Sequence, residues 1–235
     1  MLTVEAPGGA REILLHACCA PCSGAVLECL RDSGIRATVF FSNSNIYPRA
    51  EYDHRLAELQ RYADRMGVEL VADEYDHDAW LAAVRGLEDE PERGGRCAAC
   101  FRFRLERAAR YAASRGLPVV ATTLASSRWK DLEQVNDAGE AACSTSLHVS
   151  QLPETSFGPH RFASLAVPPL TVPRVARFPE AAAASVPSQA VEFWPQNWRK
   201  GGLQERRNEV IREQGFYNQT WCGCEFSRNH NPLKL

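Results

Sequence analysis

Short apolar runs alternate along the chain with longer segments in which apolar residues recur every three or four positions. Runs of this length predict buried β-strands, and the recurring pattern predicts amphipathic helices. Glycine closely follows several of the periodic segments, which is typical of helix ends. We therefore expect strands at residues 12–17, 36–43, 68–75, 117–124 and 190–194, and helices at residues 22–34, 50–67, 76–86, 98–116, 132–142 and 203–215.

The order of these elements indicates the fold class. Alternating strands and helices predict an α/β fold with a doubly wound, mostly parallel, Rossmann-like sheet and helices on both faces. The predicted topology is similar to that of PP-loop enzymes, although no SGGxDS loop follows the first strand. In sheets of this kind, ligands bind at the carboxyl ends of the strands.

Length and composition narrow the class further. The 235 residues suit one domain, spanning residues 1–235, and 45% hydrophobic residues with a net charge of −2 argue against disorder. Residues 147–189 are rich in Pro, Ala and Ser without periodicity, which predicts an insertion or mobile loop, and residues 216–235 form a C-terminal tail. Without a run of about 18 apolar residues or a basic N-terminal signal, we expect a cytoplasmic protein with no membrane span.

Seven of the nine cysteines lie in three tight clusters. An odd number of cysteines argues against a fully paired disulfide framework. Thiolates are soft ligands that suit zinc and iron–sulfur clusters, and seven exceed the four that one centre needs. Adjacent cysteines usually point apart, so the pattern suggests two metal centres side by side at the carboxyl ends of the strands. The clusters are Cys18, Cys19 and Cys22 after the first strand, Cys97 and Cys100 at the fourth helix, and Cys222 and Cys224 in the tail.

Spacing alone leaves the chemistry of these cysteines open. Zinc would make the site structural or Lewis acidic, whereas an iron–sulfur cluster would make it an electron carrier. The segment "CCAPC" could also be a redox dithiol at a helix N-terminus, where the pKa of a thiol is lowered. The two remaining cysteines, Cys29 and Cys143, are expected to be buried small apolar residues.

Five blocks in a fixed order carry a resemblance that covers nearly the whole chain. They read "LLHACCAPCSG", "VFFSNSNIYPRAEYDHRL", "EYDHDAWLAAVRGLEDEPERGGRCAACFRFRLERAA", "TTLASSRWKDLEQVNDAG" and "GFYNQTWCGCEFS". With them the sequence resembles the QueH family of epoxyqueuosine reductases. The resemblance implies reduction of epoxyqueuosine to queuosine at the wobble position of tRNA, the last step of queuosine biosynthesis. The alternative is a zinc-stabilised RNA-binding protein without redox activity.

The resemblance also implies the cofactors and their ligands. A 4Fe-4S cluster and a second metal ion, iron or zinc, are expected, held by the seven clustered cysteines. The short spacing of Cys97 and Cys100 lets both bind the same centre. We assign them to the 4Fe-4S cluster, together with Cys22 and either Cys18 or Cys19. The remaining cysteine of that adjacent pair would then bind the second metal with Cys222 and Cys224. A cluster passes electrons singly, so an external electron donor is required.

Candidate catalytic residues are few. The resemblance points to Asp76 as a proton donor and to Tyr47 as part of the pocket, while residue type and position alone favour a helix N-cap for Asp76 and an Asn/Pro turn around Tyr47. His16 is expected to be a buried, satisfied histidine at a strand end.

Contacts to tRNA are expected from local basic segments. Residues 93–115 hold seven arginines against the single acid Glu106, which suits phosphate neutralisation, although a solvated helix face explains such a run equally well. Aromatic residues near the last cysteines could stack on an unpaired base or pack the tail down. The candidate tRNA-binding residues are Arg102, Arg107, Arg199, Lys200 and Arg206.

Besides the insertion at residues 147–189, the chain departs from the family pattern at two places. A Ser-Pro-His-Lys run is expected where the chain has residues 127–130, and an acid is expected before the aromatic residue where the chain has Asn197 before Trp198. Both departures concern substrate contacts rather than the cysteines. The residues of the first departure are Ser127, Arg128, Trp129 and Lys130.

Overall fold

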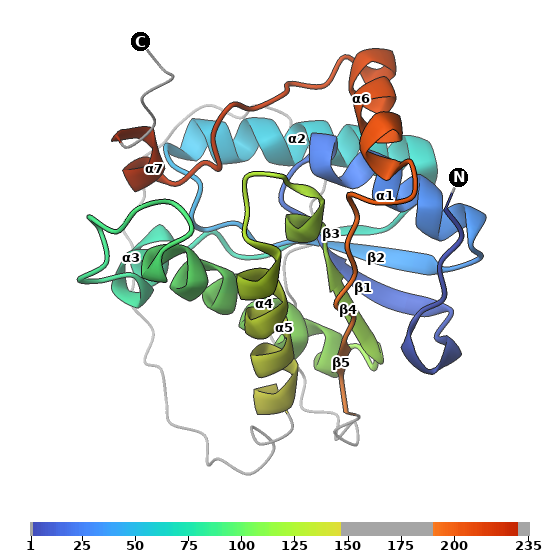
Figure 1. Cartoon of the computed structure of the whole chain (residues 1–235), viewed down its shortest axis with the longest axis horizontal. Helices are drawn as coiled ribbons and strands as arrows, with labels where there is room; N and C mark the ends of the chain where they lie inside the picture. The colour runs from blue at the N-terminus through green and yellow to red at the C-terminus, as the bar shows by residue number, and fades with distance from the viewer. Residues whose placement is uncertain (1, 147–189, 230–235) are drawn as a thin grey trace, which may run out of the picture.

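The computed structural model describes residues 2–146 and 190–229, and it contains a five-stranded sheet in the order β3-β2-β1-β4-β5 (Figure 1). Every paired strand is parallel to its neighbour. This confirms the α/β class with a parallel sheet, while likeness to PP-loop enzymes stays a prediction. The strands are β1 (Glu12–His16), β2 (Arg36–Phe41), β3 (Leu70–Ala72), β4 (Val119–Thr122) and β5 (Glu192–Phe193).

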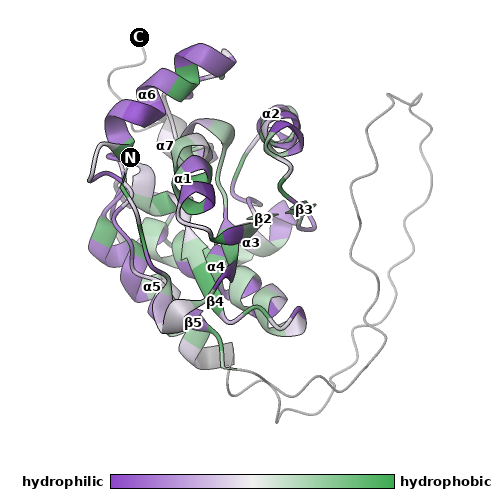
Figure 2. Ribbon diagram, turned by 90° about the vertical axis from the view of Figure 1, so that its right-hand side faces the viewer, coloured by the Kyte–Doolittle hydropathy of each residue, from purple (hydrophilic) through white to green (hydrophobic). Residues whose placement is uncertain are grey.

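Helices cover both faces of the sheet, as the alternation predicts (Figures 1 and 2). One face carries α1 (Ala20–Asp32), α2 (Arg49–Met66) and α6 (Leu203–Gln214), and the other carries α4 (Gly95–Ser114) and α5 (Leu132–Ser146). The short elements are η1 (Pro7–Gly9), α3 (His77–Ala83), η2 (Thr123–Ser126) and α7 (Glu225–Asn229). No helix within the described ranges is long and apolar enough to cross a membrane.

The order of strands creates a crevice at their carboxyl ends. β1 lies between β2 and β4, and the chain leaves β1 toward α1 on one face but leaves β4, through η2, toward α5 on the other. The loops after β1 and β4 therefore diverge, and this divergence is where ligands bind in open α/β sheets. The whole of β1 beyond Glu12 is buried, with no exposed surface at Ile13, Leu14 or Leu15.

A glycine lets the last long helix pack against the first. A Cβ atom at Gly24 of α1 would lie 2.6 Å from Cγ1 of Val210 on α6, closer than side chains approach in real proteins. The two helices are also joined by a bidentate ion pair, in which Arg206 Nε and Nη2 lie 2.7 and 3.0 Å from the Glu28 carboxylate. This packing fixes the start of the tail that carries the last two cysteines.

Several predicted boundaries differ from the observed ones. The strand expected at residues 68–75 is limited to β3, the strand expected at residues 190–194 is limited to β5, and the helix expected at residues 76–86 ends at Ala83. The short helices η1, η2 and α7 were not expected. The predicted insertion at residues 147–189, and residues 230–235 of the tail, lie outside the described residues.

Candidate metal centre

All seven clustered cysteines line one cavity of about 1130 Å³. Its walls come from the β1–α1 turn, the start of α4, the loop after η2 and the tail before α7. The β1–α1 turn and the loop after β4 and η2 follow adjacent strands at their carboxyl ends. The three cysteine clusters, which lie far apart in the sequence, therefore share one cavity, and their role as metal ligands stays a prediction.

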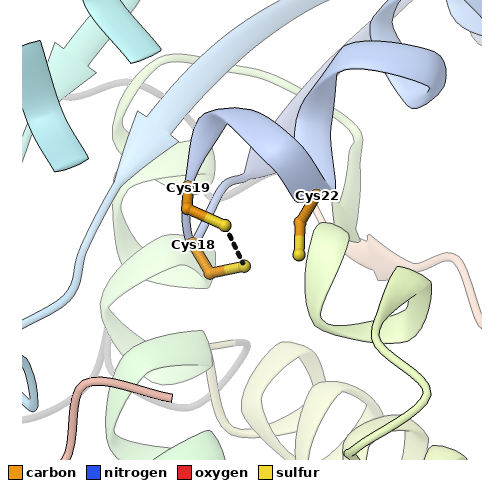
Figure 3. Close-up of side chains that lie close together, drawn as sticks. All are labelled: Cys18, Cys19 and Cys22. Atoms are coloured by element: carbon orange, nitrogen blue, oxygen red, sulfur yellow. Dashed lines mark hydrogen bonds between the residues drawn. The ribbon is translucent and has the colours of Figure 1, made fainter. Parts of the chain in front are cut away.

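The first cluster is the tightest group of thiols. The sulfur atoms of Cys18, Cys19 and Cys22 lie within 4.8 Å of one another, and the Cys18 and Cys19 sulfurs are 3.8 Å apart (Figure 3). Cys19 is the extended residue that precedes α1, with φ −176° and ψ 165°, and Cys22 follows in the first turn. The expectation that the adjacent thiols point apart was wrong, because this turn brings both sulfurs to the same side.

Charge is shared unequally among these three thiols. Hydrogen bonds from the thiols of Cys19 and then Cys22 hold the pKa of Cys18 well below its usual range. The same hydrogen bond with Cys18 raises the pKa of Cys19 well above its usual range. The cluster thus holds a thiolate readily, and the thiolate is the metal-binding form of cysteine.

A second group of thiols lies where α4 meets the tail. Cys100 and Cys224 are buried together with Trp80, and Cys222 packs against them. Cys222 Sγ lies 3.4 Å from the backbone nitrogen of Cys224, and a hydrogen bond from the Cys224 thiol lowers the pKa of Cys222 well below its usual range. At the start of α4, burial raises the pKa of Cys97 to about 11.

The tail is fastened to the β2–α2 region by its backbone. Tyr47 N–H donates to Gly223 O at 2.9 Å, and Arg55 Nη1 donates to Cys222 O at 3.0 Å. Gly223 has φ +102°, and a Cβ there would lie 2.9 Å from Ile46. Glycine alone suits such a left-handed, crowded position, so the sequence "CGC" is explained by this turn.

Cationic side chains surround the thiols. The cavity is lined by eight basic residues against two acidic ones, Asp89 and Glu92. Burial lowers the pKa of Lys130, but the negative charges of Cys18, Cys22 and Cys222 outweigh this and leave it raised. Lys130 lines the same cavity as both groups of thiols. The basic lining residues are Arg55, Arg93, Arg96, Arg104, Arg128, Lys130, Arg199 and Arg207.

The donor set fits a thiolate-bound metal centre. The seven cysteines of the cavity are free thiols, and five of them are buried. Buried thiolates are soft ligands for zinc, iron and iron–sulfur clusters. The cations that line the cavity compensate the negative charge that several thiolates bring to one buried place.

The candidate catalytic residues lie outside the cavity lining. Asp76 caps α3, where its Oδ1 accepts a hydrogen bond from Ala79 N–H at 2.9 Å. The Tyr47 side chain is 46% exposed and stacks on His77 with ring centroids 5.1 Å apart. The structure does not test a catalytic role for either residue, so that role stays a prediction.

His16 is the buried, satisfied histidine that the sequence predicts. Its ring nitrogens lie 2.8 Å from Thr122 Oγ1 and 3.1 Å from Ser42 O, and the side chain has no exposed surface. Burial, followed by the positive charge of Arg104, lowers the pKa of His16 to about 3. It therefore ties the ends of β1, β2 and β4 together as a neutral ring.

The predicted tRNA-binding residues differ in whether their side chains are already held in ion pairs. Arg199 lines the cavity, and Lys200 is exposed beside it. Arg102 pairs with Glu106 on the exposed face of α4. Arg107 forms a bidentate ion pair with the buried Asp73. Arg206 pairs with Glu28, Glu209 and Glu213.

Sequence reasoning missed several lining residues. It counted the arginines of residues 93–115 as one charged run, but the helix turns Arg96 and Arg104 inward and Arg102 outward. It noted Arg128 and Lys130 only as part of an unexpected segment. A helical-face analysis of α4, beginning from Cys97 and Cys100, would have placed Arg96 and Arg104 on the cysteine side.

The comparisons with known proteins agree with this geometry. The family model described as "Epoxyqueuosine reductase QueH" matches residues 13–157 and 171–230. A relative of that name from Histophilus somni is 38% identical over 224 residues, which cover 95% of this chain and 75% of the relative. The relative of that name from Acinetobacter baylyi is 36% identical over 235 residues, with 100% and 88% coverage. The one from Haemophilus influenzae is 37% identical over 224 residues, with 95% and 74% coverage. The chain belongs to the epoxyqueuosine reductase QueH family.

Proposed function

We propose that this protein is an oxidoreductase that converts epoxyqueuosine to queuosine at the wobble position of tRNA, the last step of queuosine biosynthesis. The observation that carries the proposal is the convergence of seven cysteines, from three distant segments, on one cavity lined by eight basic residues. The names of its relatives supply the reaction. Since its substrate is tRNA, we place the reaction in the cytoplasm.

The proposed cofactors are a 4Fe-4S cluster and a second metal ion, iron or zinc, held by Cys18, Cys19, Cys22, Cys97, Cys100, Cys222 and Cys224. When bound, the cluster supplies electrons one at a time and the second metal supplies a Lewis acid. Removing the oxygen of an epoxide to leave an alkene takes two electrons and two protons and releases water. An external electron donor must therefore reload the centre.

The cations of the cavity have two tasks in this proposal. Lys130 and Arg104 line the cavity together with the thiols and balance their charge. Arg93, Arg128 and Arg199 also line the cavity, and Arg93 and Arg128 are exposed. Exposed arginines beside a cavity neutralise phosphates of a polyanion. Arg199 and Lys200 thus remain proposed tRNA contacts, whereas the ion pairs of Arg107 and Arg206 favour structural roles for those two residues.

The cavity also offers polar atoms for the modified base. Asn45 Oδ1 and Arg96 Nη2 are buried and have no hydrogen-bond partner among the described residues. Both residues are 1% exposed and line the cavity. A buried polar atom without a partner costs free energy that a ligand can recover. We propose that Asn45 accepts from, and Arg96 donates to, polar groups of the epoxyqueuosine nucleoside.

Protons for the reaction are proposed to come from Asp76 or through the pocket around Tyr47. The family resemblance is the basis for giving these two residues that role. Asp76 holds the first turn of α3, and Trp80 of that helix packs against Cys100 and Cys224. A loss of activity in Asp76→Asn could therefore also come from movement of Trp80, so iron content must be measured with activity.

The test is a direct conversion assay. Anaerobically reconstituted protein is mixed with tRNA that carries epoxyqueuosine and with a chemical reductant, and the digested nucleosides are separated by mass. We expect queuosine to replace epoxyqueuosine in the sample with wild-type protein, and no replacement with Cys97→Ala. Protein that carries its full metal complement and binds the tRNA but forms no queuosine would refute the proposal.

A further inference from the structure

Trp129 is an exposed aromatic residue at the edge of the cavity. The described residues expose three large apolar side chains, and of these only Trp129, at 57% exposure, lines the cavity. Its ring is contacted by the Arg128 guanidinium, 4.8 Å from the ring centroid. A tryptophan ring this exposed leaves much of its aromatic surface accessible to a ligand in the cavity.

The backbone that carries this ring is fixed from outside the loop. Arg93 Nε donates to Trp129 O at 3.1 Å, and Arg93 Nη2 donates to Arg128 O at 3.2 Å. Gln134 Nε2 of α5 in turn donates to Arg93 O at 2.6 Å. Arg93 has φ +68°, an uncommon conformation for a residue other than glycine. Uncommon backbone conformations persist where the surroundings hold them and cluster at functional sites.

Arg93 also connects the Trp129 loop to the thiols. Arg93 N–H lies 3.3 Å from Cys97 Sγ, so one residue contacts both a cysteine of the cavity and the Trp129 loop. Lys130, the next residue after Trp129, lines the same cavity as Cys18 and Cys222. Consecutive Cα atoms are about 3.8 Å apart. Because Trp129 and the seven cysteines line one cavity, a group that stacks on Trp129 lies beside the thiol-lined space.

We propose that Trp129 is a stacking platform for an unpaired base of the tRNA substrate, and that Arg128 contacts a phosphate beside that base. The inference rests on the proposed function, in which a base of the anticodon loop must leave its stack to reach the cavity. Aromatic rings hold unstacked bases of single-stranded RNA through their faces, and arginine beside the ring adds charge. Trp129 thereby positions the substrate without taking part in the redox step.

The test uses a fluorescein-labelled anticodon stem–loop RNA with unmodified guanine at the wobble position. Its dissociation constant is measured by anisotropy for the wild-type holoenzyme and for Trp129→Ala, Trp129→Leu and Trp129→Phe. We expect Ala and Leu to weaken binding roughly 5- to 100-fold and Phe to keep most of the affinity, because stacking needs an aromatic face. The matched control is Arg36→Ala, which removes an exposed cation at the amino end of β2, the opposite edge of the sheet.

Two further readouts separate stacking from damage to the site. Iron per chain must equal that of the wild type in every variant, and quenching of tryptophan fluorescence by the RNA must shrink in Trp129→Phe. Wild-type affinity in both Trp129→Ala and Trp129→Leu would overturn the inference, as would failure of the wild-type protein to bind the stem–loop. RNA binding that depends on Trp129 without formation of queuosine would instead overturn the proposed function alone.

Discussion

His77 bridges the second thiol group and the sheet: its Nε2 lies 2.9 Å from Oε1 of Glu225, the first residue of α7. Its Nδ1 lies 2.7 Å from Ser44 O in the loop after β2. The ring also stacks on Trp80, with centroids 5.3 Å apart. A single side chain thus connects the tail that carries Cys222 and Cys224 to the carboxyl end of β2.

Removing this bridge should loosen the tail. We expect His77→Ala to lower the free energy of unfolding by about 1–3 kcal/mol, since a hydrogen bond to a charged group and a ring contact are lost. We also expect iron to leave the protein faster in the presence of a chelator, which absorption spectra follow over time. Asp78→Asn, an exposed change on the same helix, should leave the rate of iron loss unchanged. Equal rates in His77→Ala and wild type would show that the bridge does not retain the metal.

The Arg107–Asp73 ion pair predicts an effect on stability rather than on RNA binding. The Asp73 side chain is 4% exposed and the Arg107 side chain 20% exposed. Breaking a buried pair leaves an uncompensated charge and costs about 3–5 kcal/mol. For Arg107→Ala we expect the free energy of unfolding, measured in urea, to fall by an amount near the lower end of that range. Arg102→Ala on the same helix, whose partner Glu106 is 36% exposed, should change stability by less than about 1 kcal/mol. Similar stability of the two variants would contradict this assignment.

The cysteines divide into those of the cavity and those of the core. We expect Cys97→Ala and Cys222→Ala to abolish queuosine formation while far-UV circular dichroism stays that of the wild type. Cys29→Ala is the matched control, because Cys29 has no exposed surface, lies outside the cavity and donates to Leu2 O. It should remain active and lose about 1 kcal/mol of stability. Full activity in either cavity variant would contradict the proposal that these cysteines hold two metal centres.

Cys143 should be chemically silent. Burial raises the pKa of the Cys143 thiol to about 12, so almost none of it is thiolate near neutral pH. The raised pKa also means that this thiol favours the folded state below about pH 9 and that the contribution is lost as the pH rises toward 12. We expect maleimide labelling of Cys143, read by mass spectrometry, to be roughly 1000-fold slower at pH 8 in the folded protein than in urea, because the thiolate fraction falls by about that factor. Labelling at equal rates would show that the thiol is accessible.

Elements with local signals were predicted well. The apolar run of β1, Pro21 in the first turn of α1, and Gly67 with φ +65° after α2 need no information from distant residues. β3 is shorter than predicted because the backbone groups that follow it form hydrogen bonds with a side chain instead of with a neighbouring strand. The Ser44 hydroxyl lies 3.4 Å from Glu74 O and 3.1 Å from Asp76 N, in place of a neighbouring strand.

The cysteine ligands of the site could be predicted from the sequence, but the roles of its charged residues could not. Cysteine spacing indicated a joint site because short spacings and the carboxyl ends of strands are visible in sequence. The roles of the arginines depend on acids far away in the chain: Asp73 lies 34 residues from Arg107, and Glu28 lies 178 residues from Arg206. A count of charges along a helix contains no such information.

Whether the seven cysteines hold an iron–sulfur centre is tested by measuring iron, zinc and acid-labile sulfide per chain in anaerobically purified protein. We expect about four sulfides per chain with either four or five irons or four irons and one zinc, and a brown absorption band that bleaches in air. Colourless protein with one or two zincs and no sulfide, in which no cluster can be reconstituted anaerobically, would contradict this expectation and favour a zinc-stabilised RNA-binding protein.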